Sequence, residues 1–236
     1  MTLRKVLIGF KQGFLVDDKS FSELLGAFAG DGWMSKGSSG ISLFITGNPK
    51  DEREYYDKRI SVLFKKTFKI KVLPREFPYW GTYGICVGKR FVTKEFISAG
   101  MTVGKKCNTV KVPATTIANP KLYAPFICGL FDTDGCIYFK KSYNKNASKW
   151  QKANHHIPII MIGTVSKNLA TDSLKVLHFL GLKFSIRIMK PYNGNYPTYR
   201  LELEGKAKAK EFFRKIKPKN KRHIDKFELW LSQGFY

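Results

Sequence analysis

The stretch ICGLFDTDG at Ile127–Gly135 and its earlier counterpart LLGAFAGDG at Leu24–Gly32 decide the fold of this chain. Each stretch is an apolar run with small residues at intervals, and each closes on Asp-Gly. The two aspartates, Asp31 and Asp134, lie 103 positions apart, and 102 residues follow the second one. Such an even division indicates an internal duplication, with two similar halves facing each other.

The repeat extends beyond these two stretches. Val62-Leu63-Phe64 recurs as Val176-Leu177-His178 at an offset of 114, and Lys94-Glu95-Phe96 recurs as Lys210-Glu211-Phe212 at an offset of 116. The offset grows mainly across residues 142–152, a stretch of lysines and turn-forming residues. We interpret this stretch as the tip of a long, basic β-hairpin.

Each half has the same predicted order of elements: a helix that carries the Asp-Gly stretch, two strands, an amphipathic helix, two strands and a closing helix. The fold class is therefore α+β, with two pseudo-symmetric αββαββα halves at 1–100 and 121–236, a linker at 101–120 and antiparallel sheets. The predicted ranges are strands Ile41–Thr46 and Ile157–Gly163, helices Asp51–Phe68 and Ser166–Leu180, strands Lys71–Glu76, Thr82–Val87, Lys183–Met189 and Thr198–Glu204, and helices Lys89–Ala99, Lys206–Ile216 and Lys221–Leu231.

Composition points to a folded protein that meets a polyanion. The 236 residues are 43% hydrophobic, and 42 Lys and Arg against 18 Asp and Glu leave a net charge of +24 along the whole length. Nucleic acid is the first partner to expect for so basic a chain. The four cysteines show neither CxxC pairing nor zinc-ligand spacing, and no stretch approaches membrane-spanning length. We expect an intracellular protein, either in the cytoplasm of a prokaryote or in an organelle.

Small residues four positions apart predict that the two motif helices pack against each other. Gly26 and Gly30 lie on one helix face, and Gly129 and Thr133 repeat the spacing, which lets two backbones approach closely. Asp31 and its counterpart would end their helices, each followed by a glycine suited to a left-handed C-terminal cap.

A carboxylate at a helix C-terminus opposes the helix dipole, which costs roughly 0.3–1 kcal/mol. A single Asp-Gly is most simply an ordinary turn signal. Two copies at matched positions favour a compensating cation, and Mg²⁺ accepts one or two carboxylates together with water and phosphate oxygens. The predicted metal site comprises Asp31 and Asp134 with the residues before them, Gly30 and Thr133. Asp132 has Ala29 as its counterpart, which indicates a capping or structural role.

The motifs resemble the LAGLIDADG motif of homing endonucleases, in the single-chain form with two motifs. The second copy keeps Gly129, Leu130, Asp132, Asp134 and Gly135, whereas the first has Ala27 and Ala29 at two of the family's positions. The resemblance implies two motif helices at the centre and sheets that form a saddle over the DNA major groove. It also implies that aspartates at the eighth motif position, Asp31 and Asp134, bind an essential divalent metal and that cleavage of both strands leaves short 3′ overhangs.

The family also has basic side chains near the metals, at positions that vary. Offset matching pairs Lys105 with Lys221 and Lys106 with Arg222, and we nominate Lys105 and Lys221 as catalytic. Base reading is expected from outward side chains of the strands and their ends. These candidates are Trp33, Ser35, Lys36, Ser42, Lys71, Arg75, Tyr79, Lys140, Tyr143, Lys183, Arg187, Lys190, Tyr192 and Arg200.

The predicted function is a site-specific double-strand DNA endonuclease, a monomer that acts in intron homing. Mg²⁺ is the expected cofactor, with Mn²⁺ able to substitute and Ca²⁺ binding without cleavage. Two alternatives stay open: an RNA maturase that assists group I intron splicing, with intron RNA as a partner, and a non-cleaving DNA-binding regulator. The paired aspartates argue against the regulator. The absence of flanking splicing motifs favours a free-standing protein over an intein.

Overall fold

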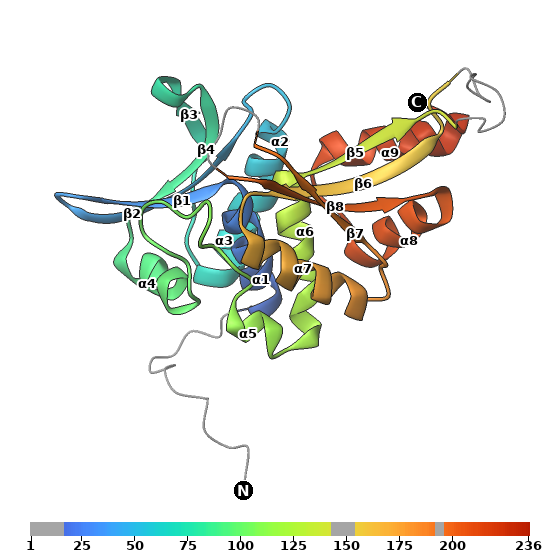
Figure 1. Ribbon diagram of the computed structural model, residues 1–236. Coiled ribbons are helices and arrows are strands. Elements are labelled where there is room, and N and C mark those ends of the chain that lie inside the picture. Colours follow the sequence, from blue (N-terminus) through green and yellow to red (C-terminus); the bar gives the residue numbers. More distant parts are fainter. Residues whose placement is uncertain (1–16, 143–153, 192–195) are drawn as a thin grey trace, which may run out of the picture.

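The computed structural model describes residues 17–142, 154–191 and 196–236, which form two halves of one topology (Figure 1). Each half follows the predicted αββαββα order. The first half consists of α1 (Asp18–Asp31), β1 (Gly32–Gly37), β2 (Gly40–Gly47), the continuous helix α2 (Arg53–Tyr55), η1 (Tyr56–Ile60) and α3 (Ser61–Phe68), then β3 (Arg75–Phe77), the short turn η2 (Pro78–Trp80), β4 (Thr82–Val87) and α4 (Arg90–Ser98). A connecting segment then carries α5 (Ala114–Ile117) and η3 (Pro120–Leu122).

The second half repeats this order and adds a C-terminal helix. It consists of α6 (Tyr123–Asp134), β5 (Gly135–Lys140), β6 (Ile157–Thr164), α7 (Lys167–Phe179), β7 (Ser185–Met189), β8 (Thr198–Glu204), α8 (Lys206–Ile216) and α9 (Lys221–Gln233). The two antiparallel sheets have equivalent strand orders, β1-β2-β4-β3 and β5-β6-β8-β7. The α+β prediction is therefore confirmed. Strand β3 differs from its predicted range, since it begins at Arg75 rather than Lys71. It directly follows Pro74, a residue that has no N–H to donate to a neighbouring strand.

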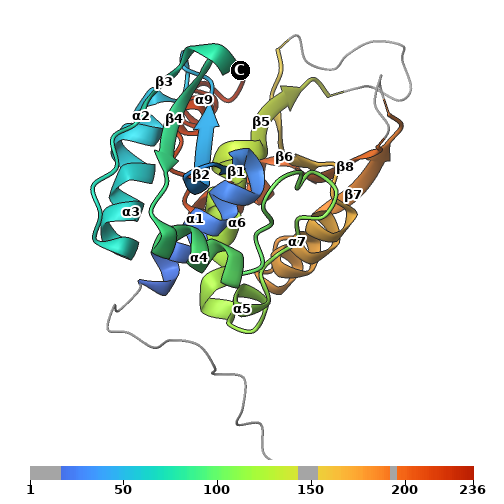
Figure 2. The ribbon, with the colours of Figure 1, turned by 90° about the vertical axis from the view of Figure 1, so that its left-hand side faces the viewer.

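Helices α1 and α6 pack side by side at the centre, and the two sheets extend from them to opposite sides (Figure 1). Figure 2 shows α3 on one side of this pair and α7 on the other. A Cβ added to Gly26 would lie 2.0 Å from the Phe126 carbonyl oxygen, and one added to Gly129 would lie 2.0 Å from the Glu23 carbonyl oxygen. The two backbones are thus in direct contact, as the spacing of small residues predicts.

The glycines after the two aspartates differ from expectation. Gly32 has φ −89° and ψ 157°, and Gly135 has φ −87° and ψ 164°, so both are extended rather than left-handed. The chain passes from each helix straight into a strand, and each glycine lies against the aromatic ring of Phe28 or Phe131, where a Cβ would approach within 2.4 Å. Close packing, and not the capping conformation, requires glycine here.

The sheets have one face on the core and one face outward. Met34, Leu43 and Ile45 are buried beneath the helices, while Trp33 and Phe44 alternate with them on the opposite face. Among the described helices, none has both the length and the apolarity that crossing a bilayer requires.

Candidate active site at the paired helix ends

The carboxylates of Asp31 and Asp134 meet where α1 and α6 end. Each aspartate is the last residue of its helix, and the two helices are packed along their length. A Cβ added to Gly30 would lie 2.1 Å from Thr133 Oγ1 and 3.2 Å from Asp134 Cγ. One carboxylate therefore lies against the backbone of the residue that precedes the other.

Burial of these carboxylates disfavours their charged forms. Burial raises the pKa of Asp31 to about 7, and the charges of Asp134 and Glu52 add to this effect. Burial likewise raises the pKa of Asp134 to about 6, although Lys106 and Arg222 oppose it. Within the described ranges, no Lys, Arg or His forms an ion pair within 4.0 Å of either group. Two adjacent acids lacking a direct cationic partner form a donor set that fits a divalent cation.

Lys106 and Arg222 bring positive charge to the same helix ends. The buried Lys106 Nζ donates to the carbonyl oxygens of Phe28 at 2.7 Å and Ala29 at 2.6 Å, and to that of Gly30. Arg222 donates to the carbonyl oxygen of Thr133 at 3.2 Å. Each basic side chain thus binds the carbonyl immediately before the aspartate of its own half. Burial lowers the pKa of Lys106 to about 8, against the opposing charges of Asp134 and Asp31.

Glu52 connects the two halves beside this site and was not among the predicted residues. Its buried carboxylate accepts hydrogen bonds from Asn48 N at 2.7 Å and Asn220 Nδ2 at 2.9 Å, and it forms an ion pair with Arg222 at 3.2 Å. Nearby, the Tyr56 hydroxyl donates to Asp31 Oδ2 at 3.4 Å. An acid before a helix is ordinary in sequence, so only the fold reveals that Glu52 positions Arg222.

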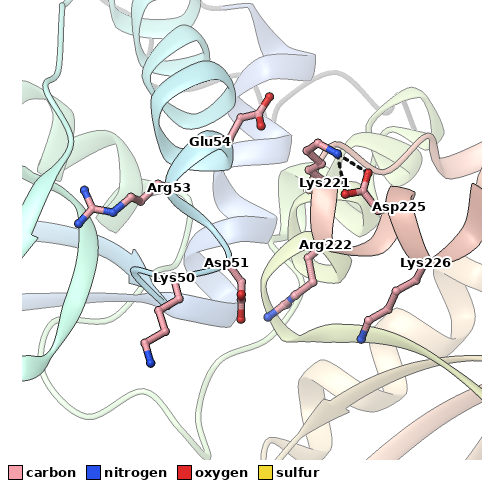
Figure 3. Close-up of a pocket in the computed structure, with 8 residues that line it drawn as sticks. All are labelled: Lys50, Asp51, Arg53, Glu54, Lys221, Arg222, Asp225 and Lys226. Atoms are coloured by element: carbon pink, nitrogen blue, oxygen red, sulfur yellow. Dashed lines mark hydrogen bonds and ion pairs between the residues drawn. The ribbon is translucent and has the colours of Figure 1, made fainter.

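The structure does not bring Lys105 and Lys221 to the carboxylates. Lys105 is exposed and lies over the ring of Tyr196, 5.7 Å from its centroid. Lys221 is also exposed and forms an ion pair with Asp225. Figure 3 shows Lys221 turned toward Asp225 at one end of a pocket, while the Arg222 guanidinium points to the other end. The prediction for Lys105 and Lys221 is therefore wrong. Their sequence neighbours, Lys106 and Arg222, lie beside the carboxylates instead.

A pocket of about 320 Å³ lies beside the carboxylates on the Lys106 side, lined by Gly30, Lys106, Asp134 and Thr164 among others. A second pocket, of about 550 Å³, lies between the start of the α2 helix and the start of α9 on the Arg222 side (Figure 3). The first pocket therefore reaches Gly30 and Asp134 at the helix ends, whereas the second reaches Arg222.

Comparison with known proteins agrees with this geometry. Residues 121–217 match the family described as LAGLIDADG-like domain. The chain carries a LAGLIDADG-like domain. Over most of its length it also has the fold of the single-chain homing endonucleases. It superposes on a variant of the homing endonuclease I-DmoI with a TM-score of 0.58 at 16% identity, covering 84% of this chain and 90% of the other. For the homing endonuclease I-WcaI bound to its DNA recognition sequence, the TM-score is 0.50 at 16% identity, with coverage of 92% and 88%.

Two curated relatives come from Methanocaldococcus jannaschii, and both are much longer. An uncharacterized protein is 26% identical over 201 residues, which is 82% of this chain and 20% of the relative. The replication factor C small subunit is 26% identical over 209 residues, which is 89% of this chain and 10% of the relative. This chain therefore spans a fifth or less of the curated relatives that it matches.

The predicted DNA-reading residues fall into four groups. Strand register places Trp33, Ser35, Ser42, Arg75, Lys140, Arg187 and Arg200 on the outer faces of the two sheets. Lys36 belongs to the opposite row of β1, since it follows Ser35 and successive side chains alternate. Lys71, Tyr79, Lys183 and Lys190 lie outside the strands and are exposed. Tyr143 and Tyr192 lie outside the described residues. The base contacts of all these residues stay predictions.

Gly30 and Thr133 contribute main-chain oxygens beside the carboxylates. Those oxygens accept the hydrogen bonds from Lys106 and Arg222 described above. The Thr133 hydroxyl donates to the carbonyl oxygen of Gly129 at 3.0 Å, so it faces its own helix. Direct metal ligation by Gly30 and Thr133 stays a prediction.

A separate cluster of Glu23, Cys128 and Asp132 is buried between α1 and α6. Its acids already have partners: Arg59 pairs with Glu23, and the backbone N–H groups of Lys219 and Asn220 donate to Asp132. Asp132 thereby fixes the start of α9. This arrangement agrees with the structural role that its unmatched position in the repeat indicates.

Replacing Lys106 with Met is expected to slow DNA cleavage by about a hundredfold or more, because a buried positive charge at both aspartates would be lost. Lys105→Met removes the same charge one position earlier, from an exposed side chain, and serves as the matched control with an expected change of less than about threefold. Cleavage rates on one target, with thermal unfolding of each variant, check this. A larger loss for Lys105→Met would contradict the assignment.

The raised pKa values also predict how stability of the metal-free protein depends on pH. In the unfolded chain both aspartates have the ordinary pKa of 3.8 and release their protons above that pH. In the folded state Asp31 keeps its proton up to about pH 7, and Asp134 keeps its proton up to about pH 6. These two groups therefore lower the free energy of unfolding as pH rises through that window. Asp31→Asn is expected to become more stable relative to wild type from pH 4 to pH 7.

Chemical denaturation in EDTA measures this difference at each pH. Asp18→Asn, at an exposed position in the first turn of α1, is the control for removing an acid outside the site. A stability advantage of Asp31→Asn that shrinks as pH rises would contradict the assigned direction of the shift.

Proposed function

We propose that this protein is a site-specific endonuclease that uses a divalent metal to hydrolyse both strands of a long, asymmetric DNA target and leaves short 3′ overhangs. The observation that carries the proposal is the pair of half-buried carboxylates, Asp31 and Asp134, at adjoining helix ends without an ion-pair partner among the described residues. Buried anionic groups in contact require compensation, and a divalent cation supplies it.

Asp31 and Asp134 would hold the metal, which would supply Lewis-acid chemistry for phosphodiester hydrolysis. The other side chains have roles that follow from their positions. Lys106, with a pKa of about 8, is mostly protonated at pH 7. Its ammonium group donates to three carbonyl oxygens of α1, so it would act on a scissile phosphate through its positive charge. Arg222 is held by Glu52 and offers its remaining donors to the phosphate on the other side.

The cofactor and partner assignments rest on this donor set and on relatives. Structures of I-DmoI are described in complex with DNA and Ca, and with DNA and Mn. We propose Mg²⁺ as the cofactor here, with Mn²⁺ as a substitute and Ca²⁺ supporting binding without cleavage, and double-stranded DNA as the partner of a monomer. The two outer sheet faces differ in composition, which supports an asymmetric target rather than a palindrome.

Selection of cleaved sites from a randomised DNA library in Mg²⁺ tests the proposal. The expected result is one enriched duplex sequence cut on both strands at a fixed offset. Incubation of the same protein preparation with an intron-containing RNA, followed by measurement of splicing, tests the alternative of splicing assistance. Splicing enhancement without a cut on any selected DNA would overturn the endonuclease assignment.

Binding to the selected target should weaken steeply with salt. The net charge of +24 provides many Lys and Arg for phosphate contacts, and each contact that releases a counterion adds to the salt dependence. The expected slope of log affinity against log salt concentration is about −5 or steeper. Fluorescence anisotropy in Ca²⁺ at several salt concentrations measures it. A flat profile would mean that the positive charge does not contact the DNA backbone.

A further inference from the structure

The outer face of the first sheet carries a compact cluster of four aromatic rings, Trp33, Phe44, Phe77 and Trp80, which we call the aromatic cluster. Trp33 stacks on Phe44 with ring centroids 4.9 Å apart, and Trp80 meets both rings edge-on at 5.2 and 5.5 Å. Phe77 stacks on Trp80 at 5.6 Å. Trp80 remains 47% exposed, so apolar surface is presented to the outside of the sheet.

Three features place this cluster in the path of the DNA. Trp33 follows Asp31 by two residues, so the cluster begins at the edge of the carboxylate site. Its rings lie on the sheet face away from the core, in one row with Ser35 and Ser42. Arg75 lies over the Phe77 ring, 5.1 Å from its centroid, and its exposed guanidinium borders the apolar surface. This surface suits a polyanion that displays apolar groups beside its charged backbone.

The second sheet has different side chains at the equivalent positions. Strand register matches Trp33 with Cys136, Phe44 with Met161 and Phe77 with Met189. That outer face also carries Arg187 on β7 and three charged residues on β8, which are Arg200, Glu202 and Glu204. The two halves therefore present unlike chemistry to the two halves of a duplex target.

We propose that the aromatic cluster recognises thymine 5-methyl groups in the major groove of the half-site that the first sheet covers. This inference rests on the proposed endonuclease function. The thymine methyl is the apolar group that base edges display in the major groove, whereas the other groups there are hydrogen-bond donors and acceptors. Aromatic rings would leave such polar groups unpaired and desolvated, which is unfavourable. At a rise of about 3.4 Å per base, rings spaced 5 to 6 Å apart cover about three base pairs.

Substitution of deoxyuridine for thymine tests this, because it removes only the 5-methyl group and keeps base pairing. Duplexes of the selected target, with thymines replaced in one half or the other, are titrated in Ca²⁺. We expect replacement of thymines to weaken binding in only one half of the target, by about fourfold for each methyl group that is contacted. Trp80→Ala should weaken binding to the thymine duplex and lose this sensitivity to deoxyuridine.

Tyr138→Ala is the matched control, because Tyr138 is an aromatic residue of similar exposure on the outer face of the second sheet. It should leave the deoxyuridine effect of the Trp80-dependent half unchanged. Equal binding of all duplexes would overturn the inference, and so would a deoxyuridine effect that Trp80→Ala leaves intact. In either case cleavage of the selected target would still support the proposed function. If no target is cleaved or bound, the proposed function and this inference fail together.

Discussion

Asp31→Asn and Asp134→Asn are each expected to lower the rate of double-strand cleavage by about three orders of magnitude or more, while DNA affinity changes by less than about threefold. Asparagine keeps the size and shape of the side chain but removes the charge that would hold the metal. The phosphate contacts come from basic residues elsewhere, so binding should persist. Plasmid cleavage in Mg²⁺ and anisotropy in Ca²⁺ measure the two properties separately.

Asp51→Asn provides the control for this pair. Asp51 is an exposed acid that lines the pocket beside Arg222, so the same chemical change is made close to the site but outside it. Its cleavage rate should stay near that of wild type. Wild-type turnover by Asp31→Asn or Asp134→Asn would refute the shared metal site.

Gly26→Ala and Gly129→Ala are expected to destabilise the protein by about 3 kcal/mol or more each, a large fraction of the stability of a folded domain. The added methyl group would have to occupy space 2.0 Å from a carbonyl oxygen of the facing helix. Backbone cannot rotate away as a flexible side chain can, so α1 and α6 must separate. Urea denaturation followed by circular dichroism measures the loss.

Gly88→Ala is the matched control for the helix glycines. A Cβ at Gly88 meets only Ser42 Oγ, at an ordinary distance of 3.7 Å. The expected change in free energy of unfolding is within about 1 kcal/mol. Equal effects of Gly26→Ala and Gly88→Ala would mean that loss of glycine flexibility, rather than the close helix contact, determines stability.

The duplicated pattern predicts most of the fold because each element has a strong local signal. The alternation in Thr198–Glu204 and the stripe in Lys206–Ile216 match β8 and α8 at both ends. The glycine spacing also predicts which helices meet. Even the pairing of Lys106 with Arg222 follows from the offset between the halves.

The choice between adjacent basic residues could not be made in the same way. Lys105 and Lys106 lie in an irregular segment, where no helix or strand period indicates which side chain points inward. Glu52 gains its role from Asn220, which is 168 positions away, and a contact of that range leaves no local pattern. The extended conformation of Gly32 likewise depends on packing against Phe28 rather than on the Asp-Gly sequence.

The direct backbone contact between α1 and α6 has a consequence for evolution of this protein. Because main-chain atoms set the separation of Asp31 and Asp134, substitutions on the outer sheet faces leave that separation unchanged. For the endonuclease proposed above, new target sequences could therefore be acquired by substitutions on the surface of either half independently, while the distance between the two cut positions stays constant. Diversification of specificity and conservation of the cutting geometry thus fall on different parts of the chain.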